Sequence, residues 1–313
     1  MHDVIIIGGG PAGLTAAIYA SRARLKTLLV ESFTVAGQAV ITSDIENYPG
    51  FPDVLGGFDL IDKFKKQATK FGAEFKVADV KSISSCKHED KPALEVEAGS
   101  EKILSLSVIV ASGARPKSLG IPGEDKFRGK GVSYCAVCDA AFFKGKEIIV
   151  VGGGDTAVEE AMFLTKFAKK VKLIHRRDRL RATKILQERA FANKSIEFVW
   201  NSVATEILGK DRVETVRIKN LKTEKTTDLP TDGVFIFAGY IPNTDFLKGV
   251  INLDEAGYIL ADNDMKTSKP GVFVAGDARK KILRQVITAA GDGATAAYSA
   301  RLYVEELKGI AYK

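Results

Sequence analysis

Short apolar runs, each followed by a glycine-rich turn, divide this chain of 313 residues into α/β units. The first run, Val4–Ile7, predicts a buried parallel strand, and the pattern after its turn predicts a helix from Ala12 to about Arg22. A second apolar run, Thr27–Val30, predicts the next strand, which ends at Glu31. The N-terminal pattern is therefore strand, helix, strand, as in a parallel α/β fold.

The turn after the first strand carries the spacing G-x-G-x-x-G at Gly8, Gly10 and Gly13. In this setting the first glycine makes a tight turn, the second lets the backbone approach a pyrophosphate, and the third lets the helix pack on the strand. Glu31 stands where an acid binds a ribose 2′-hydroxyl. We predict a dinucleotide site that fits the ADP part of FAD or NAD; the alternative is a glycine-rich loop without a ligand.

A second copy of this pattern begins near residue 147. Glu147–Val151 predicts a strand, Val158–Phe167 a helix with one apolar face, and Val171–Ile174 the next strand. The turn between the first strand and the helix has the spacing G-x-G-x-x-A. It comprises Gly152, Gly153, Gly154, Asp155, Thr156 and Ala157.

The second strand of this copy is followed by basic residues instead of an acid: His175, Arg176, Arg177 and, slightly later, Arg181. An acid at this place would repel a 2′-phosphate, whereas guanidinium groups bind one in bidentate fashion. We predict a preference for NADPH over NADH. The alternative is a solvated basic start of a helix.

Breaks in the pattern suggest where the chain passes between its two halves. An apolar strand ends in Gly/Pro-rich sequence at 107–116, and a similar strand and break recur at 232–244. Beyond them, Val272–Asp277 predicts a strand ending in an acid, and 284–297 a small-residue helix. We therefore predict an α/β fold with two Rossmann-like, three-layer domains, the second inserted into the first: 1–114 with 245–313 for FAD, and 115–244 for NADPH. The two crossings are expected to form a hinge.

Cys135 and Cys138 form a C-x-x-C motif in the inserted domain, and Asp139 follows directly. A two-residue spacer lets two cysteines reach disulfide distance, and a neighbouring acid can carry the proton of thiol exchange. Zinc would need two further ligands, and only Cys86 and three histidines remain. We predict a redox pair; a zinc site and an inert buried pair are the alternatives. Cys86 is expected in a surface loop with no role.

The charge pattern excludes several function classes. The net charge is +7, but basic residues are spread along the chain without a nucleic-acid motif, so we expect no nucleic-acid partner. No apolar run approaches the roughly 20 residues of a membrane span. The N-terminus does not look like a signal peptide. We expect a cytoplasmic protein without a metal or a membrane partner.

The motifs of both halves, in this order, resemble the low-molecular-weight thioredoxin reductases of bacteria, archaea, fungi and plants. The resemblance extends over the whole chain. The stretches that carry it are GGGPAG (8–13), GQ (37–38), ENYPGFP (46–52), ASGARP (111–116), IPGE (121–124), CAVCD (135–139), GGGDTAVEEA (152–161), HRRDRLRA (175–182), GVFIFAGYIPNT (233–244), TSKPGVFVAGD (267–277) and RQVITAAGDG (284–293).

The resemblance implies an NADPH-dependent, FAD-containing homodimer that reduces thioredoxin. It implies that Cys138 faces the flavin, that Cys135 attacks the protein substrate, and that Asp139 is the acid/base. A glutaredoxin-like protein partner and a small-molecule dithiol remain alternatives as substrates. The FAD contacts that it implies, beyond the first glycine turn and Glu31, are Gly37, Gln38, Asn47, Gly276, Asp277, Arg284, Gln285 and Val286.

This chain departs from the family pattern at a few positions. Val137 stands where the family usually has threonine, and Ala140 where it usually has glycine. Ala39 follows Gln38 where leucine or methionine is usual. These departures bear on the fit to a partner and on the reduction potential of the cysteine pair.

Overall fold

The chain divides into two compact units, one of which is inserted into the other. A computed structural model describes residues 1–32, 37–42 and 45–311. The first unit comprises Met1–Arg115 and Ile241–Lys313, and the second comprises Pro116–Tyr240. Residues 241–244, which the sequence pattern assigns to the inserted domain, belong to the first unit. At the two crossings, β7 (Ala114–Pro116) pairs with β16 (Tyr240–Pro242).

The first unit is built on a sheet in the order β3-β2-β1-β6-β5-β4, with β17 also paired to β6. The strands β1, β2, β3, β6 and β17 are parallel, and β4 and β5 extend the sheet in antiparallel fashion. The strands are β1 (His2–Ile7), β2 (Thr27–Glu31), β3 (Glu74–Val77), β4 (Val80–His88), β5 (Lys91–Ala98), β6 (Glu101–Val110) and β17 (Val272–Val274).

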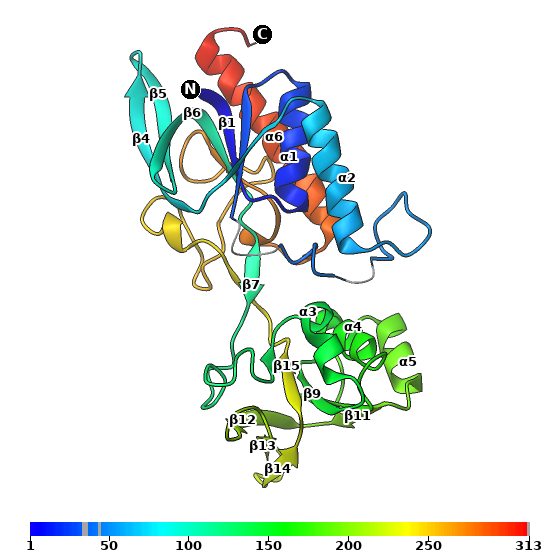
Figure 1. The fold of residues 1–313 in the computed structure, drawn as a ribbon. Coiled ribbons are helices and arrows are strands. Elements are labelled where there is room, and N and C mark those ends of the chain that lie inside the picture. The colour runs from blue at the N-terminus through cyan, green and yellow to red at the C-terminus, as the bar shows by residue number, and fades with distance from the viewer. Residues whose placement is uncertain (33–36, 43–44, 312–313) are drawn as a thin grey trace. The chain divides into compact units, whose positions relative to one another are not determined.

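Three helices lie together on one side of this sheet: α1 (Pro11–Arg22), α2 (Gly57–Lys70) and α6 (Val286–Lys308) (Figure 1). Neighbouring strand residues alternate between two cores: Ile6 packs toward the helices and Ile5 toward the opposite face, which η2 (Asp245–Leu247) helps to cover. Burial on both faces explains why the central strands are continuous apolar runs. The turn η3 (Gly276–Ala278) follows β17.

The second unit has a parallel sheet in the order β11-β10-β9-β15-β8 and an antiparallel sheet β12-β13-β14. Helical segments pack on one face of the parallel sheet, and the antiparallel sheet packs on the other face. The strands are β8 (Val132–Ser133), β9 (Glu147–Val151), β10 (Lys170–Ile174), β11 (Ile196–Val199), β12 (Ser202–Leu208), β13 (Thr215–Asn220), β14 (Thr226–Pro230) and β15 (Gly233–Ile236). The helices are α3 (Ala136–Asp139), η1 (Ala140–Phe143), α4 (Asp155–Leu164) and α5 (Lys184–Ala192).

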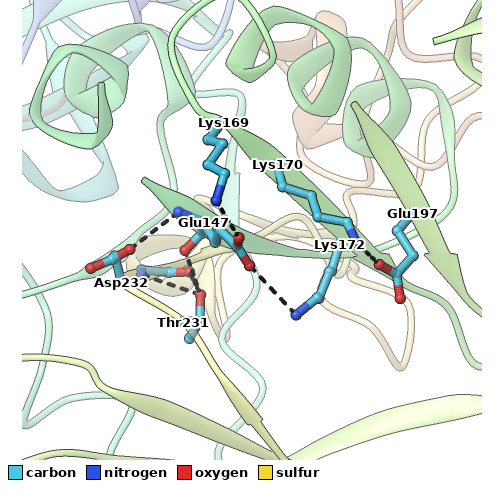
Figure 2. Close-up of polar contacts among 8 residues, drawn as sticks. Glu147, Lys169, Lys170, Lys172, Glu197, Thr231 and Asp232 are labelled. Carbon is cyan, nitrogen blue, oxygen red and sulfur yellow. Dashed lines mark hydrogen bonds and ion pairs between the residues drawn. The ribbon is translucent and has the colours of Figure 1, made fainter. Parts of the chain in front are cut away.

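Polar contacts join the strands of the second unit where β9 begins (Figure 2). The backbone N–H of Glu147 donates to Asp232 at 3.1 Å, and the Thr231 hydroxyl donates to the Glu147 carbonyl at 3.1 Å. The Glu147 carboxylate lies 3.3 Å from the Lys169 ammonium. These contacts anchor β9 beside β15 at the end of the sheet opposite to the glycine turn that follows β9.

Three sequence expectations differ from the structure in detail. The helix expected to begin at Val158 begins at Asp155, because the end of the glycine turn already has helical hydrogen bonds. The helix expected over 284–297 runs from Val286 to Lys308, between a capping box at Gln285 and Gly309 in the left-handed conformation. Cys86 lies on β4 and not in a loop, because this strand pairs along its length with β5.

Candidate functional site

The glycine turn of the first unit has the geometry of a phosphate-binding turn. Gly8 has φ +113°, and a Cβ there would lie 2.3 Å from the Ala111 carbonyl oxygen. A Cβ on Gly13 would lie 1.8 Å from the Gly8 carbonyl oxygen, so close packing demands both glycines. A Cβ on Gly10, by contrast, would meet nothing within 4 Å. Protein packing therefore does not explain Gly10, whereas the approach of a pyrophosphate does.

Glu31 lies at the end of β2, directly beside this turn. A Cβ on Gly9 would lie 2.1 Å from Oε2 of Glu31, so the carboxylate rests against the backbone of the turn. Its other oxygen accepts a hydrogen bond of 2.6 Å from Lys65 on α2. The sequence pattern did not identify Lys65, which comes from a helix outside the strand–turn–helix unit. This placement fits a carboxylate that binds a ribose hydroxyl.

Two expected FAD contacts that are far apart in the sequence meet in the structure. The Asn47 side-chain amide donates to Oε1 of Gln285 at 3.2 Å. Gln285 is the N-cap of α6, which begins at Val286. Gly37 and Gln38 lie in a turn of their own, in which Val40 donates to the Gly37 carbonyl and Thr42 to the Gln38 carbonyl.

Asp277 and Arg284 have buried polar atoms without a partner. Among the described residues, Oδ1 of Asp277 and Nε of Arg284 make no hydrogen bond. Burial raises the pKa of the Asp277 carboxyl, while the positive charges of Lys281 and Arg284 oppose that shift. Buried polar atoms without a partner are rare in folded proteins and need an explanation. A ribityl chain with several hydroxyls would satisfy them, so these residues fit FAD.

The second glycine turn repeats the geometry of the first. Gly152 leaves no room for a Cβ, which would lie 2.5 Å from the Cβ of Ala157. A Cβ on Gly153 would lie 2.3 Å from Nδ1 of His175. Gly154 is open, with Arg181 as its nearest neighbour at 3.8 Å. Gly154, the second glycine of the G-x-G-x-x-A spacing, therefore corresponds to Gly10 of the first turn: it faces free space where a pyrophosphate can approach.

The basic segment after β10 folds back onto this turn. The backbone N–H of Arg181 donates to the Gly153 carbonyl at 2.7 Å, and that of Thr183 donates to Oδ1 of Asp155 at 2.6 Å. The segment is not a helix, since α5 begins only at Lys184. The side chains of Arg176, Arg177 and Arg181 are exposed. Within the described part of the chain, none of the three forms an ion pair with a carboxylate, so they are available to a 2′-phosphate.

His175 is the buried member of the basic segment, with 6% of its surface exposed. Burial lowers the pKa of its imidazole, and the charges of Arg181, Arg176 and Arg177 lower it further. The ring lies against Gly153 and supports the turn, and both burial and the neighbouring arginines disfavour its protonated form.

Cys135 and Cys138 form a disulfide with their Cα atoms 5.4 Å apart. Cys135 is the N-cap of α3, and the backbone N–H of Cys138 donates to its Sγ at 3.2 Å. A thiolate formed at Cys135 would keep this N–H as a donor, which favours the ionised form. Cys138 is exposed and Cys135 is half-buried. In the described part of the chain, no group of three or more His, Cys, Asp or Glu side chains is placed to hold a metal ion.

Asp139 lies at the end of α3, next to Cys138. It lines a cavity of about 240 Å³ together with Phe142, Lys130, Lys146 and further residues of the second unit. Basic side chains and the exposed ring of Phe142 line the cavity, and Asp139 connects it to the cysteine motif, as the residue that follows Cys138. This position is compatible with proton transfer to a thiol that is released next to it.

Sequence reasoning missed the residues that hold the cysteine motif in place. Ser133 is buried, and its hydroxyl contacts both the N–H and the carbonyl of Cys135, at 3.1 and 3.2 Å. The Tyr134 hydroxyl donates to Glu124, a buried carboxylate of the IPGE stretch. The stretch was matched to the family, but no local pattern indicated that its acid would contact the residue before the first cysteine.

Comparison with known proteins places these features in one family. The sequence pattern of the pyridine nucleotide-disulphide oxidoreductase family matches residues 2–293. The thioredoxin reductase of Peptoclostridium acidaminophilum is 51% identical over 314 residues, covering 97% of this chain and 98% of the relative. That of Listeria innocua is 48% identical over 309 residues, covering 98% and 95%.

Two solved structures support the same relationship. The thioredoxin reductase of Lactococcus lactis superposes with a TM-score of 0.94 at 44% identity, covering 98% of this chain and all of the other. The thioredoxin reductase of T. acidophilum superposes with a TM-score of 0.90 at 33% identity, covering 96% of this chain and 97% of the other. No helix of the described residues is both long and apolar enough to cross a membrane.

Proposed function

This chain belongs to the pyridine nucleotide-disulphide oxidoreductase family, and on that premise we propose that it is a thioredoxin reductase that uses NADPH and FAD. The first unit binds FAD and the second binds NADPH. Bound FAD supplies two-electron transfer between the nicotinamide of NADPH and the Cys135–Cys138 disulfide. The reduced cysteines then reduce the disulfide of thioredoxin.

One observation carries the proposal: the segment from Arg176 to Arg181 folds onto the second glycine turn, in the same unit as the redox disulfide. The arginines hold the 2′-phosphate of NADPH, and the open face of Gly154 receives its pyrophosphate. In the first unit, Glu31 and the open face of Gly10 receive the ADP part of FAD, and Asp277 binds the ribityl chain.

The chain's own residues also perform the thiol chemistry. Cys135, with the Cys138 N–H directed at its sulfur, is the thiolate that attacks the partner disulfide. A mixed disulfide forms between Cys135 and the partner, and Cys138 attacks Cys135 to release the partner as a dithiol. Asp139 exchanges a proton with Cys138. We expect a homodimer that works in the cytoplasm, where thiols stay reduced.

An anaerobic titration tests this path. NADPH is added to the full-length flavoprotein, oxidised thioredoxin follows, and the flavin absorbance is recorded for wild type, Cys138→Ser and Cys86→Ser. NADPH should bleach the flavin in all three proteins. Thioredoxin should restore the absorbance in wild type and in Cys86→Ser, whose substituted thiol lies outside the path, but not in Cys138→Ser.

Each failure points to a different part of the proposal. If NADH bleaches the flavin and NADPH does not, the assignment of the arginines is wrong. If NADPH bleaches the flavin but thioredoxin never restores it in wild type, the partner is wrong; a glutaredoxin-like protein and a small dithiol would then be tried in its place. If Cys138→Ser turns over as wild type does, the disulfide is not on the path.

A further inference from the structure

Helix α6 carries a buried carboxylate that the proposed function does not use. Asp292 stands between Gly291 and Gly293, and only 8% of its surface is exposed. A Cβ on Gly293 would lie 2.1 Å from the Ala12 carbonyl oxygen, so this part of α6 lies directly against α1. A charge at such a place is costly unless it is paired and hydrogen-bonded.

Three groups of the protein contact Asp292, one backbone N–H and two cationic side chains, and all three contact its Oδ2 atom. This oxygen accepts the backbone N–H of Gly276 at 3.1 Å and the ammonium of Lys281 at 2.7 Å, and it lies 3.1 Å from Nε of Arg279. The Lys281 side chain is itself only 7% exposed. One carboxylate thus joins α6 to the turn η3 and to the segment that follows it.

The residue after Gly276 is Asp277, whose Oδ1 is buried without a partner among the described residues. Gly276 has φ +76°, and a Cβ there would lie 2.9 Å from the Cβ of Ala12 on the phosphate-binding helix. The turn therefore packs closely against α1, and a hydrogen bond to Asp292 holds it to α6. Lys281 forms an ion pair with Asp292 and also interacts electrostatically with Asp277.

We propose that Asp292 is a positioning residue of the FAD site: it holds the Gly276 N–H and engages Lys281, so that Asp277 stays directed at the ribityl hydroxyls. The inference rests on the proposed binding of FAD to the first unit. Without Asp292, the buried Lys281 would have Asp277 as its carboxylate partner, and Asp277 would turn away from the cofactor. Asp292 thus acts on FAD through Asp277, without touching FAD.

A double-mutant cycle separates this role from simple stabilisation. Flavin fluorescence released on serial dilution of the full-length holoprotein gives the FAD dissociation constant of wild type, Asp277→Asn, Asp292→Asn and the double variant. We expect each single substitution to weaken FAD binding by about tenfold or more. Because Asp292 acts through Asp277, the double variant should match Asp277→Asn within about threefold. If the two effects multiply in full, Asp292 acts independently of Asp277 and the proposal is overturned.

A second pair of variants guards against loss of folding. Asp292→Asn takes from Lys281 its carboxylate partner on α6. Lys281→Met with Asp292→Asn removes both charges of this ion pair, keeps an oxygen for the Gly276 N–H, and leaves Arg279, whose side chain is 18% exposed, as the remaining cation. This neutral pair should bind FAD within about threefold of wild type. Lys281→Met with Asp292→Ala, which lacks the acceptor, should remain about tenfold weaker. Equal affinities for the two neutral pairs would overturn the role of the acceptor oxygen.

A matched control lies on the same helix. Glu305 forms a more accessible pair with Arg301, at 3.7 Å, and Glu305→Gln should leave FAD binding unchanged. If Glu305→Gln weakens FAD binding as much as Asp292→Asn does, the loss of any negative charge on α6 is sufficient to weaken FAD binding, and the proposal fails. Failure of the proposed function looks different, since wild type itself would then bind no FAD.

Discussion

The Tyr134 hydroxyl donates a hydrogen bond of 2.5 Å to Oε1 of Glu124. Glu124 is 2% exposed, and its carboxylate also accepts the backbone N–H groups of Leu119, Gly120 and Ile121. Burial and the bond to Glu124 raise the pKa of Tyr134 to about 12, so the phenol remains a donor. Because Tyr134 directly precedes Cys135, this carboxylate links the 119–121 turn to the start of the redox motif.

Glu124→Gln should therefore destabilise the protein in a pH-dependent way. Burial alone would raise the pKa of the Glu124 carboxyl, but the bonds from Tyr134 and the backbone hold it below the ordinary value of 4.5. The stability that this depressed pKa contributes is complete above pH 4.5 and is lost as the pH falls through the folded-state pKa. We expect Glu124→Gln to cost about 2 kcal/mol at pH 7, since hydrogen bonds to a charged group are lost.

Urea unfolding of both proteins at pH 7 and at successively lower pH checks this expectation. The difference between wild type and Glu124→Gln should shrink below pH 4.5. A difference that stays constant across this range would show that the charge of Glu124 does not matter.

Gly153→Ala should lower the stability of the protein, whereas Gly154→Ala should weaken the binding of NADPH. A Cβ on Gly153 would lie 2.3 Å from His175, so we expect an overpacking cost of about 1–3 kcal/mol. Adding His175→Ala should recover much of this cost by making room. Gly154→Ala has 3.8 Å of clearance and should leave stability nearly unchanged, but it should weaken NADPH binding. Thermal unfolding and NADPH titration test the pair, and equal destabilisation by both substitutions would contradict the geometry.

Arg177→Ala and Arg181→Ala should each raise the KM for NADPH by about tenfold or more, since a charge-assisted contact to phosphate is lost. The KM for NADH should not change, because NADH has no 2′-phosphate. Arg179→Ala is the matched control, since Arg179 is exposed in the same segment and has no assigned role. Steady-state kinetics with NADPH and with NADH test this prediction. If the KM values for both nucleotides rise in parallel, the arginines do not bind the 2′-phosphate.

Thr231→Val should cost more stability than Glu147→Gln, although both residues lie in one network (Figure 2). Thr231 is 7% exposed, and its hydroxyl lies within hydrogen-bond distance of the Glu147 and Gly233 carbonyls, so its loss should cost about 1–2 kcal/mol. The Glu147 carboxylate is 40% exposed, and solvent screens its pairs with lysines, so Glu147→Gln should cost less than about 0.5 kcal/mol. Thermal unfolding of both variants should give this order; the reverse order would show that the ion pairs dominate.

Local sequence patterns predicted most of the fold. The central strands are buried on both faces and therefore appear as apolar runs, as at β1 and β9, which the sequence placed within a few residues. The strand of Cys86 was missed because its sequence, with serines around a single buried Ile83, has no apolar run, and only pairing with β5 makes it a strand. The extent of α6 was underestimated because its C-terminal cap, Gly309, lies well beyond the small-residue stretch.

The sequence by itself determined the two glycine turns, the acid and the arginines that follow them, and the C-x-x-C pair. These features depend on residues close together in the chain, whose geometry the backbone of a strand–turn–helix unit dictates. Only the tertiary structure decided which distant groups complete them: Lys65 on Glu31, Asn47 on Gln285, Glu124 on Tyr134, and Asp292 on Gly276. Such contacts satisfy buried polar atoms across separate elements, and no periodicity in the sequence records which elements will meet.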